Sequence, residues 1–353
     1  MLSDRGVQRF AAEEAREALT LWNIGDIDRL EPLAGGSRSS PKMVVHGTGG
    51  SFVLKRLSPS RDQGEHVRFA HSFIAVAARA GIPVASPVVS KAGKTLESLH
   101  GSAYELFPLI QGVRWSRTGA QAAAAGQILG RLHEAGLGLH WQGPVRATSF
   151  HGSLAVFEAI RRIPKKVCSV DASTDVGELQ AVCEAIAIAY RQASQEVDEL
   201  GYAAIDSQVV HGDFHPGNLL FQGDVIAGVI DFDAARLEPA VVDFANGVLQ
   251  FASPGGSGAH VRSWPAALSE ERVKAFMAGF TQHGDASIEM LVEMVPPLMI
   301  EACITEVSLP IARNGIFGSV RAIDMLAMVQ RRVAWLEEHG GSLQRWLRWA
   351  LSN

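Results

Sequence analysis

Short apolar runs alternate with turn residues in the first third of the chain. Residues 43–45 and 52–54 flank the glycine-rich stretch HGTGG, where glycine can adopt the positive φ angles of a hairpin turn. The segments IPVASPVV (82–89) and SAYELFPLI (102–110) are further apolar runs. Residues 64–81 are apolar over much of their surface, rich in alanine and closed by a glycine. This pattern predicts antiparallel β-structure interrupted by one helix.

The pattern becomes helical after about residue 112. Five segments have helical patterns, and the first two end at glycine: 119–136, 177–201, 269–284, 289–315 and 318–351. Pro296 and Pro297 should kink or divide the fourth of these. The polar, turn-rich segment 162–175 is expected to form a surface loop. We therefore expect an α+β chain with a small β-rich lobe over residues 1–106 and a larger, mostly helical lobe over residues 107–353.

Composition narrows the class of protein. The 353 residues are 47% hydrophobic and 20% charged, with a net charge of −5, which excludes a disordered or fibrous chain and gives no reason to expect a nucleic-acid partner. The first twenty residues contain acidic side chains and no continuous apolar stretch. We therefore expect neither a secretory signal nor a membrane span, and a cytoplasmic location. Three widely separated cysteines, Cys168, Cys183 and Cys303, are interpreted as buried thiols and not as disulfides or zinc ligands.

The densest group of polar residues is HGDFHPGNLL, residues 211–220. Two apolar runs and an intervening turn follow it and predict a β-hairpin. Asp213 and Asn218 precede the first strand, whereas Asp231 and Asp233 follow the second. Antiparallel pairing would bring these four side chains to one edge of the hairpin.

The ligand chemistry of this edge favours a hard cation. Carboxylate and amide oxygens suit Mg²⁺ better than zinc. His211 and His215 could bind zinc in principle, but no cysteine lies nearby in the sequence and no third or fourth ligand has suitable spacing.

The same stretch carries a resemblance to a known family. HGDFHPGN matches the catalytic-loop pattern H-x-D-x-x-x-x-N, and VIDFD stands where kinases carry the metal-binding D-F-G. With GQILGRLHEAG before them and EPAVVDFANGV after them, the chain resembles the aminoglycoside phosphotransferase and choline kinase-like family over roughly residues 33–248. The resemblance implies a two-lobed protein kinase-like fold that uses ATP and Mg²⁺.

The resemblance assigns roles to the residues of the motif. Asp213 would accept the proton of the acceptor hydroxyl or orient that hydroxyl. Asn218 and Asp231 would hold Mg²⁺, with Asp233 as a weaker candidate ligand. His211 would brace the loop by hydrogen bonds. A role for His215 in substrate binding or loop ordering stays open.

The resemblance also predicts a nucleotide site in the first lobe. Lys55 in SFVLKRL matches the lysine that pairs with phosphates, and its neighbour Arg56 is the rival candidate. Val53 shares a strand face with Lys55 but not with Arg56, which favours Lys55. The expected carboxylate partner of this lysine is Glu65, although an acidic residue is favourable at a helix N-terminus in any case.

Three further features complete the expected site. Gly36 and Ser37, within GGSRSS, occupy the place of a loop that covers the phosphates, although they depart from the G-x-G-x-x-G pattern. Main-chain groups near Glu105 and Phe107 would bind the adenine edge. Asp243, in AVVDFANG, matches an aspartate with a structural role in the family.

The acceptor is left open by the sequence. A lack of an A-P-E segment after DFD argues against a regulated eukaryotic-type protein kinase. The chain is similar to bacterial homoserine kinases and to bacterial stress-response Ser/Thr kinases of this fold. A small-molecule hydroxyl is favoured, on an amino acid such as homoserine, an amino alcohol, a sugar or an aminoglycoside.

Other classes explain fewer residues. A bacterial Ser/Thr protein kinase remains an alternative, and so does a non-catalytic nucleotide-binding protein, although the catalytic aspartate, metal aspartate and strand lysine are all present. A metal-dependent hydrolase would leave Lys55 unexplained. We expect no nucleic-acid or membrane partner and a monomer or homodimer. Glu301 and Glu306 are two acidic candidates for the acceptor site that the sequence cannot allocate.

Overall fold

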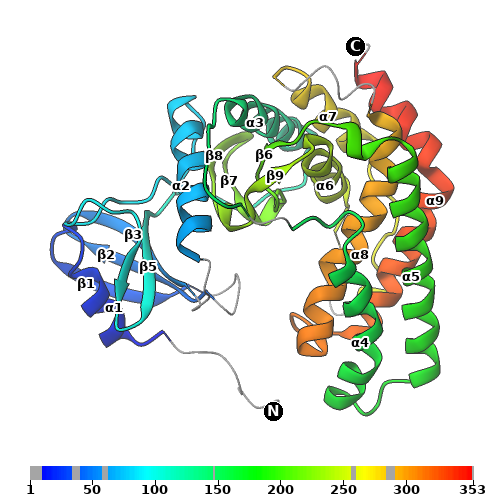
Figure 1. Ribbon diagram of the computed structural model, residues 1–353, viewed down its shortest axis with the longest axis horizontal. Coiled ribbons are helices and arrows are strands. Elements are labelled where there is room, and N and C mark those ends of the chain that lie inside the picture. Colours follow the sequence, from blue (N-terminus) through cyan, green and yellow to red (C-terminus); the bar gives the residue numbers. More distant parts are fainter. Residues whose placement is uncertain are drawn as a thin grey trace.

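The computed structural model describes residues 10–33, 40–57, 63–145, 148–255, 260–283 and 291–351. Gly36 and Ser37, predicted to cover the phosphates, lie outside the described residues. Figure 1 shows a small β-rich lobe next to a larger helical lobe, with α2 (Gln63–Arg79) on the side of the small lobe that faces the larger one. This confirms the predicted α+β, two-lobed architecture. The predicted boundary between residues 106 and 107 falls inside the last strand of the small lobe, and we keep it as a proposal.

The small lobe is built on a five-stranded antiparallel sheet of order β1-β2-β3-β5-β4. The strands are β1 (Ile27–Pro32), β2 (Lys42–Gly47), β3 (Gly50–Leu57), β4 (Glu97–Leu99) and β5 (Ser102–Pro108). Side chains alternate between the two faces. Met43, Val45 and Leu54 pack against α1 (Ala12–Leu19). Lys55 is on the opposite face, which turns toward the helical lobe.

The predicted strand at 82–89 is wrong, because these residues, all of which the structure describes, do not form a strand. This segment forms only an isolated bridge, between Val84 and Val229. Pro83 and Pro87 have no N–H groups and therefore cannot continue a ladder of hydrogen bonds. Val229 N donates to Pro83 O at 2.8 Å. The segment thus ties the first lobe to the hairpin that carries the predicted catalytic loop.

The large lobe consists mostly of helices (Figure 1). They are α3 (Gly119–Leu137), α4 (Leu154–Val170), α5 (Val176–Glu199), α6 (Ala240–Ala252), α7 (Glu270–Phe280), α8 (Val295–Asn314) and α9 (Ala322–Leu351). Short antiparallel pairs accompany them: β6 (Gln208–Val210) with β9 (Arg236–Glu238), β7 (Leu219–Gln222) with β8 (Val225–Val229), and β10 (Ile316–Phe317) with β11 (Val320–Arg321). One hydrophobic core joins these elements. Phe214 from the catalytic loop is fully buried in it, so the loop is anchored to the rigid interior.

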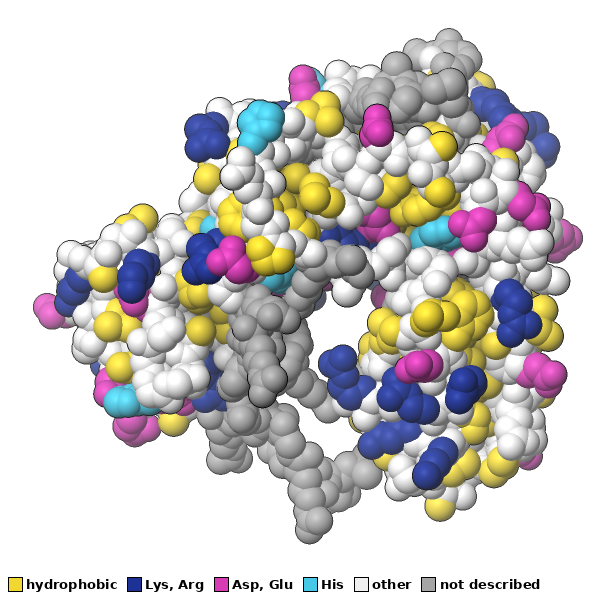
Figure 2. Space-filling view, in the orientation of Figure 1, with side chains coloured by type: hydrophobic (Ala, Val, Ile, Leu, Met, Phe, Trp, Pro, Cys, Tyr) yellow, Lys and Arg dark blue, Asp and Glu magenta, His cyan; other side chains and the backbone are white. Residues whose placement is uncertain are grey.

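The predicted loop at 162–175 is also wrong for residues 162–170, which belong to α4. Ile160, Ile163 and Val167 recur at helical spacing and are buried. Pro164 lies inside the helix. Exposed cations between these apolar positions gave the segment its polar character, and Figure 2 shows Lys and Arg side chains gathered in this region. The exposed cations that lie between the buried positions of α4 are Arg161, Arg162 and Lys165.

Pro296 and Pro297 lie in the first turn of α8 and do not divide the helix. Proline is accommodated there because the first N–H groups of a helix have no intrahelical acceptor. A short 3₁₀ turn, Val292–Met294, precedes the helix. The segment Val292–Asn314 is long and apolar enough to cross a membrane, but 78% of its most apolar window is buried inside the molecule, as in a core helix.

The cysteines lie mostly where they were expected. Cys183 and Cys303 are buried, whereas Cys168 is half-buried. All three thiols are free.

Candidate active site

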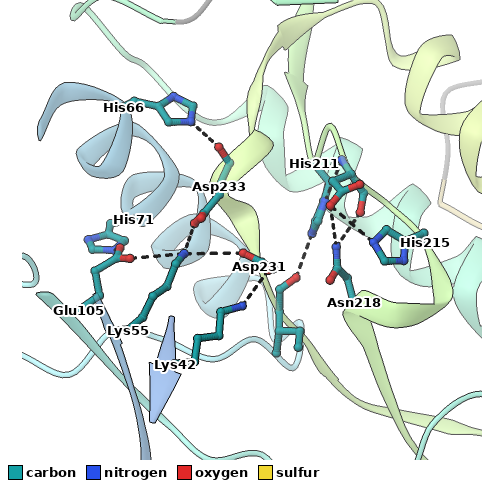
Figure 3. A network of polar contacts seen from close by, with 12 residues as sticks. Lys42, Lys55, His66, His71, Glu105, His211, His215, Asn218, Asp231 and Asp233 are labelled. Atoms are coloured by element: carbon teal, nitrogen blue, oxygen red, sulfur yellow. Dashed lines mark hydrogen bonds and ion pairs between the residues drawn. The ribbon is translucent and has the colours of Figure 1, made fainter. Parts of the chain in front are cut away.

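The predicted hairpin forms as β7 and β8, and it brings the polar motif residues together. Leu219 pairs with Val229, so the start of β7 and the end of β8 share one edge. Asn218 precedes this edge and Asp231 follows it. Asp231 adopts a left-handed backbone conformation, with φ of 64°, which bends the chain directly after β8 and turns the carboxylate toward the cleft (Figure 3).

Asp243 anchors the catalytic loop from α6. Its carboxylate accepts hydrogen bonds from His211 N at 2.7 Å and Gly212 N at 2.9 Å, and His133 Nε2 lies 3.5 Å away. Burial raises the pKa of Asp243, but His133, His211 and Arg236 outweigh it and the pKa is lowered. The carboxylate is therefore ionised, in the structural role predicted for it.

His211 is fully buried and links the loop to the end of the hairpin. Its Nε2 lies 3.3 Å from Ile230 O, and its Nδ1 accepts a hydrogen bond from Asp213 N at 3.3 Å. Burial lowers its pKa although Asp243 and Asp213 oppose this. These contacts suit a neutral imidazole that braces the loop.

Asp213 is held by its own loop and opens to the cleft. Asn218 Nδ2 donates to Asp213 O at 2.9 Å and to Asp213 Oδ2 at 3.2 Å. His215 Nε2 lies 3.5 Å from Asp213 Oδ2. Burial raises the pKa of Asp213, but His215, His211 and Asn218 lower it overall. The result is an oriented, ionised carboxylate whose side chain remains 53% exposed.

Lys55 lies at the centre of a network of acidic groups (Figure 3). Its Nζ donates to Asp233 Oδ1 and lies 3.5 Å from Glu105 and 3.6 Å from Asp231. Burial opposes the charge of Lys55, but the three carboxylates outweigh it and raise its pKa. Arg56, the rival candidate, instead pairs with Glu14 at 2.7 Å. The choice of Lys55 over Arg56 thus agrees with the placement of both side chains.

The predicted pairing of Lys55 with Glu65 is wrong. Glu65 pairs with Arg68 at the surface, and Glu105 takes its place beside the lysine. Residues 55 and 105 are directly opposite in the β3–β5 pairing, so their side chains share one face of the sheet. His71 Nε2 also contacts Glu105 Oε1 at 2.7 Å. Glu105 was predicted for its main chain, but its carboxylate is what reaches the site.

Lys42 is a site residue that the sequence reasoning missed. It is opposite Lys55 in the β2–β3 pairing, and its Nζ donates to Asp231 Oδ2 at 2.9 Å. The register of the predicted hairpin could have identified Lys42, because residues directly opposite each other in a hairpin point to the same face of the sheet. Two ammonium groups therefore converge on Asp231.

Asp231 and Asp233 differ in electrostatic state. Burial raises the pKa of Asp231, but Lys55 and Lys42 lower it overall. Burial raises the pKa of Asp233, and Asp231 and Glu105 add to this although Lys55 opposes it. Asp231 is thus the better anion for a metal, and Asp233 serves as a partner of Lys55.

The donor set fits Mg²⁺. The nitrogen of the Asn218 amide donates to Asp213, so its oxygen could serve as a metal ligand beside the ionised Asp231. Among the described residues, no group of three or more His, Cys, Asp or Glu side chains could hold a metal. Mg²⁺ in nucleotide sites characteristically uses one or two protein groups together with substrate phosphates and water, so a two-residue set is sufficient.

These residues line one cavity of about 1050 Å³. Its polar part contains Lys42, Lys55, Asp213 and Asp231. An apolar part extends to Phe107, which was predicted to lie near the adenine. The apolar lining also includes Ile74, Ala85, Leu109, Ile110, Leu220 and Ile230. The cavity therefore combines an apolar part with a charged end, as a nucleoside triphosphate requires.

Fold and site together define a protein kinase-like phosphotransferase: a strand lysine, a loop aspartate and asparagine, and an aspartate after the next hairpin share one cleft. A family model described as "phosphotransferase enzyme family" matches residues 29–287. The chain belongs to this family, and it is an ATP-dependent phosphotransferase with an alcohol group as acceptor.

Curated relatives support the assignment. A homoserine kinase of Rhodopseudomonas palustris (strain BisB18) is 30% identical over 243 residues, which cover 67% of each chain. A homoserine kinase of Afipia carboxidovorans is 29% identical over 224 residues, and the alignment covers 63% of each chain.

Solved structures show the same fold. An amicoumacin kinase in complex with AMP-PNP and Ca²⁺ has a TM-score of 0.68 at 17% identity, covering 93% of this chain and 94% of that one. A microcompartment-associated aminopropanol kinase has a TM-score of 0.66 at 15% identity, covering 95% of this chain and 99% of the other.

Proposed function

We propose that this chain transfers the γ-phosphate of ATP to the hydroxyl of a small molecule through Asp213, and that homoserine, the substrate named for its relatives, is the first acceptor to test. The observation that carries the proposal is the position and environment of the Asp213 carboxylate. An ionised carboxylate, oriented by Asn218 and His215, faces the cavity that also holds Lys55. A general base must be oriented and unprotonated before a hydroxyl arrives.

The chemical step follows from these positions. Asp213 accepts the proton of the acceptor hydroxyl, the hydroxyl oxygen bonds to the γ-phosphorus, and the bond from that phosphorus to the β–γ bridging oxygen breaks to release ADP. Mg²⁺, held by Asn218 and Asp231, would supply charge neutralisation on the phosphates. Lys55 and Lys42 supply fixed positive charge from the sheet. Because ATP is an intracellular substrate, we place the reaction in the cytoplasm.

A screen of acceptors tests the proposal. The purified protein would be incubated with Mg²⁺ and ATP and with homoserine, choline-like alcohols, sugars, aminoglycosides or a generic protein substrate. ADP release and product mass would be measured. Phosphorylation of a small alcohol is the expected result, whereas transfer only to the protein substrate, or to nothing, would refute the proposal.

Lys42→Met should weaken ATP binding. Its ammonium group lies 2.9 Å from Asp231, at the charged end of the cavity, where it would neutralise phosphate charge. One lost charged hydrogen bond corresponds to a rise in the KM for ATP of about tenfold or more. Steady-state kinetics at varied ATP would measure it, with Lys91→Met as a control at an exposed lysine bonded to Thr20 O. An unchanged KM would remove Lys42 from the phosphate site.

His215→Gln should shift the pH dependence of phosphoryl transfer. Burial lowers the pKa of His215, but Asp213, Glu306 and Asp231 raise it overall, and the protonated ring in turn lowers the pKa of Asp213. Without that positive charge Asp213 binds a proton more readily. The acidic limb of kcat against pH should therefore move to higher pH. A limb that stays in place would show that Asp213 ionisation does not limit the rate.

A further inference from the structure

A second, smaller cavity adjoins the catalytic loop. Its volume is about 300 Å³, which is suited to a small molecule. His215, Gly217, Gln250, Glu306 and Phe317 line both this cavity and the large one. The small cavity is therefore next to Asp213 and continues into the helical lobe.

Arg332 of α9 lines this cavity, and its buried charge has no counter-ion among the described residues. Its side chain is almost completely buried, with 9% of the residue exposed. Its Nη1 donates to Ser253 Oγ and its Nη2 to Pro265 O, both at 2.9 Å, and its Nε has no partner in the part of the chain that the structure describes. No described carboxylate forms an ion pair with it. Burying a charge without an opposite charge is costly, so an anionic group of a ligand would be stabilised here.

Glu306 of α8 lies where the two cavities meet. Its carboxylate accepts a hydrogen bond from Gln250 Nε2 at 2.7 Å, and it forms no ion pair with a described cation. Its charge helps to raise the pKa of His215, which places it close to the residue that contacts Asp213. The carboxylate is thus available to a cationic group of an acceptor.

The two charges belong to one site. Burial raises the pKa of the Cys303 thiol to about 12, and Arg332 lowers it while Glu306 raises it. Both charges therefore act on one thiol, which itself lines the small cavity. Glu301, the other acidic candidate, is fully buried and accepts from Gly152 N and contacts His151, so it holds a loop and is not available to a ligand.

We infer that the small cavity binds the head group of a zwitterionic acceptor, with Arg332 pairing with its carboxylate and Glu306 with its ammonium group. The acceptor is then an α-amino acid with a side-chain alcohol, whose hydroxyl reaches Asp213. This inference rests on the proposed function and adds the residues that would recognise the two charged groups of such an acceptor.

Three matched acceptors test the inference on the wild-type protein. Homoserine has both charges. The primary alcohol 3-amino-1-propanol, called aminopropanol below, lacks the carboxylate, and γ-hydroxybutyrate lacks the ammonium group. Each lost charge-assisted contact should lower kcat/KM by about 10- to 100-fold. Equal use of aminopropanol and homoserine would overturn the role of Arg332. Failure to phosphorylate any alcohol would instead refute the proposed function.

Two variants assign the contacts to residues. Arg332→Gln should lower kcat/KM for homoserine to the level of aminopropanol and leave aminopropanol itself unchanged. Glu306→Gln should lower kcat/KM for homoserine to the level of γ-hydroxybutyrate and leave the value for γ-hydroxybutyrate itself unchanged. Arg345→Gln, on the same helix but hydrogen-bonded to Ser342 at the surface, is the control and should change neither. An equal loss for all three acceptors would show that Arg332 has a merely structural role.

A third variant guards against misfolding. Because Arg332 also donates to Ser253 and Pro265, Arg332→Gln can destabilise the protein. Arg332→Lys keeps the charge and should retain a preference for homoserine over aminopropanol. Loss of that preference in a variant that still binds Mg²⁺ and ATP, measured by thermal shift, would contradict recognition by charge. Glu306 is exposed in the cleft, so its variant tests the ammonium contact independently of folding.

Discussion

Asp213→Asn is expected to lower kcat by about 100- to 10,000-fold, the usual contribution of a general base, while leaving the affinity for Mg²⁺ and ATP close to that of the wild type. The amide cannot accept the hydroxyl proton, but it preserves the shape of the side chain and one oxygen for the hydrogen bond from Asn218. Single-turnover phosphoryl transfer and thermal stabilisation by ATP would separate the two effects.

The hairpin supplies a matched control for this substitution. Asp224 is in the β7–β8 turn, at the opposite end of the hairpin from Asp213, and its carboxylate accepts a weak contact from Thr118 at 3.4 Å. Asp224→Asn should retain wild-type kcat. If Asp213→Asn also retains kcat with every accepted substrate, Asp213 is not the base, and the proposed mechanism is wrong.

Local features of the site could be predicted from the sequence because they depend on neighbouring residues. The hairpin and the positions of Asp213, Asn218 and Asp231 at one edge follow from two apolar runs and a turn. The choice of Lys55 over Arg56 required only the alternation of a strand. In both cases the relevant separation in sequence is small.

Long-range features could not be predicted in the same way. Lys55 meets Glu105 because β3 pairs with β5 in a particular register, and the sequence did not specify that pairing. Proximity along the chain suggested Glu65 instead, which faces solvent with Arg68. Arg332 is further still from the motif, and only the packing of α9 brings it to the cavity.

The error at α4 has a different origin. The loop was predicted from the turn-like composition of residues 162–175. The helical spacing of Ile160, Ile163 and Val167 is the better indicator, because it is typical of a helix packed on a core. Pro164 strengthened the wrong interpretation. Tertiary burial of one face stabilises this helix in spite of the proline.

Asp231→Asn and Asp243→Ala should separate binding from stability. Asp231→Asn removes the ionised metal ligand, so the affinity for ATP in the presence of Mg²⁺ should fall by at least about tenfold. The fold should lose less than about 2 kcal/mol, because Asn keeps an acceptor oxygen for Lys42 and because Lys55 keeps Glu105 and Asp233. Titration calorimetry and denaturant unfolding would measure the two quantities.

Asp243→Ala should have the opposite effect, with a larger loss of stability than of ATP affinity. It leaves the N–H groups of His211 and Gly212 without an acceptor in the interior, so the free energy of unfolding should fall by about 3–5 kcal/mol. Since the folded protein lowers the pKa of Asp243, this contribution is present at neutral pH and is lost as the pH falls through the folded-state pKa. The deficit of the variant should therefore shrink in acid. A larger loss of stability in Asp231→Asn than in Asp243→Ala would show that the Lys55 network supports the fold more than the loop anchor does.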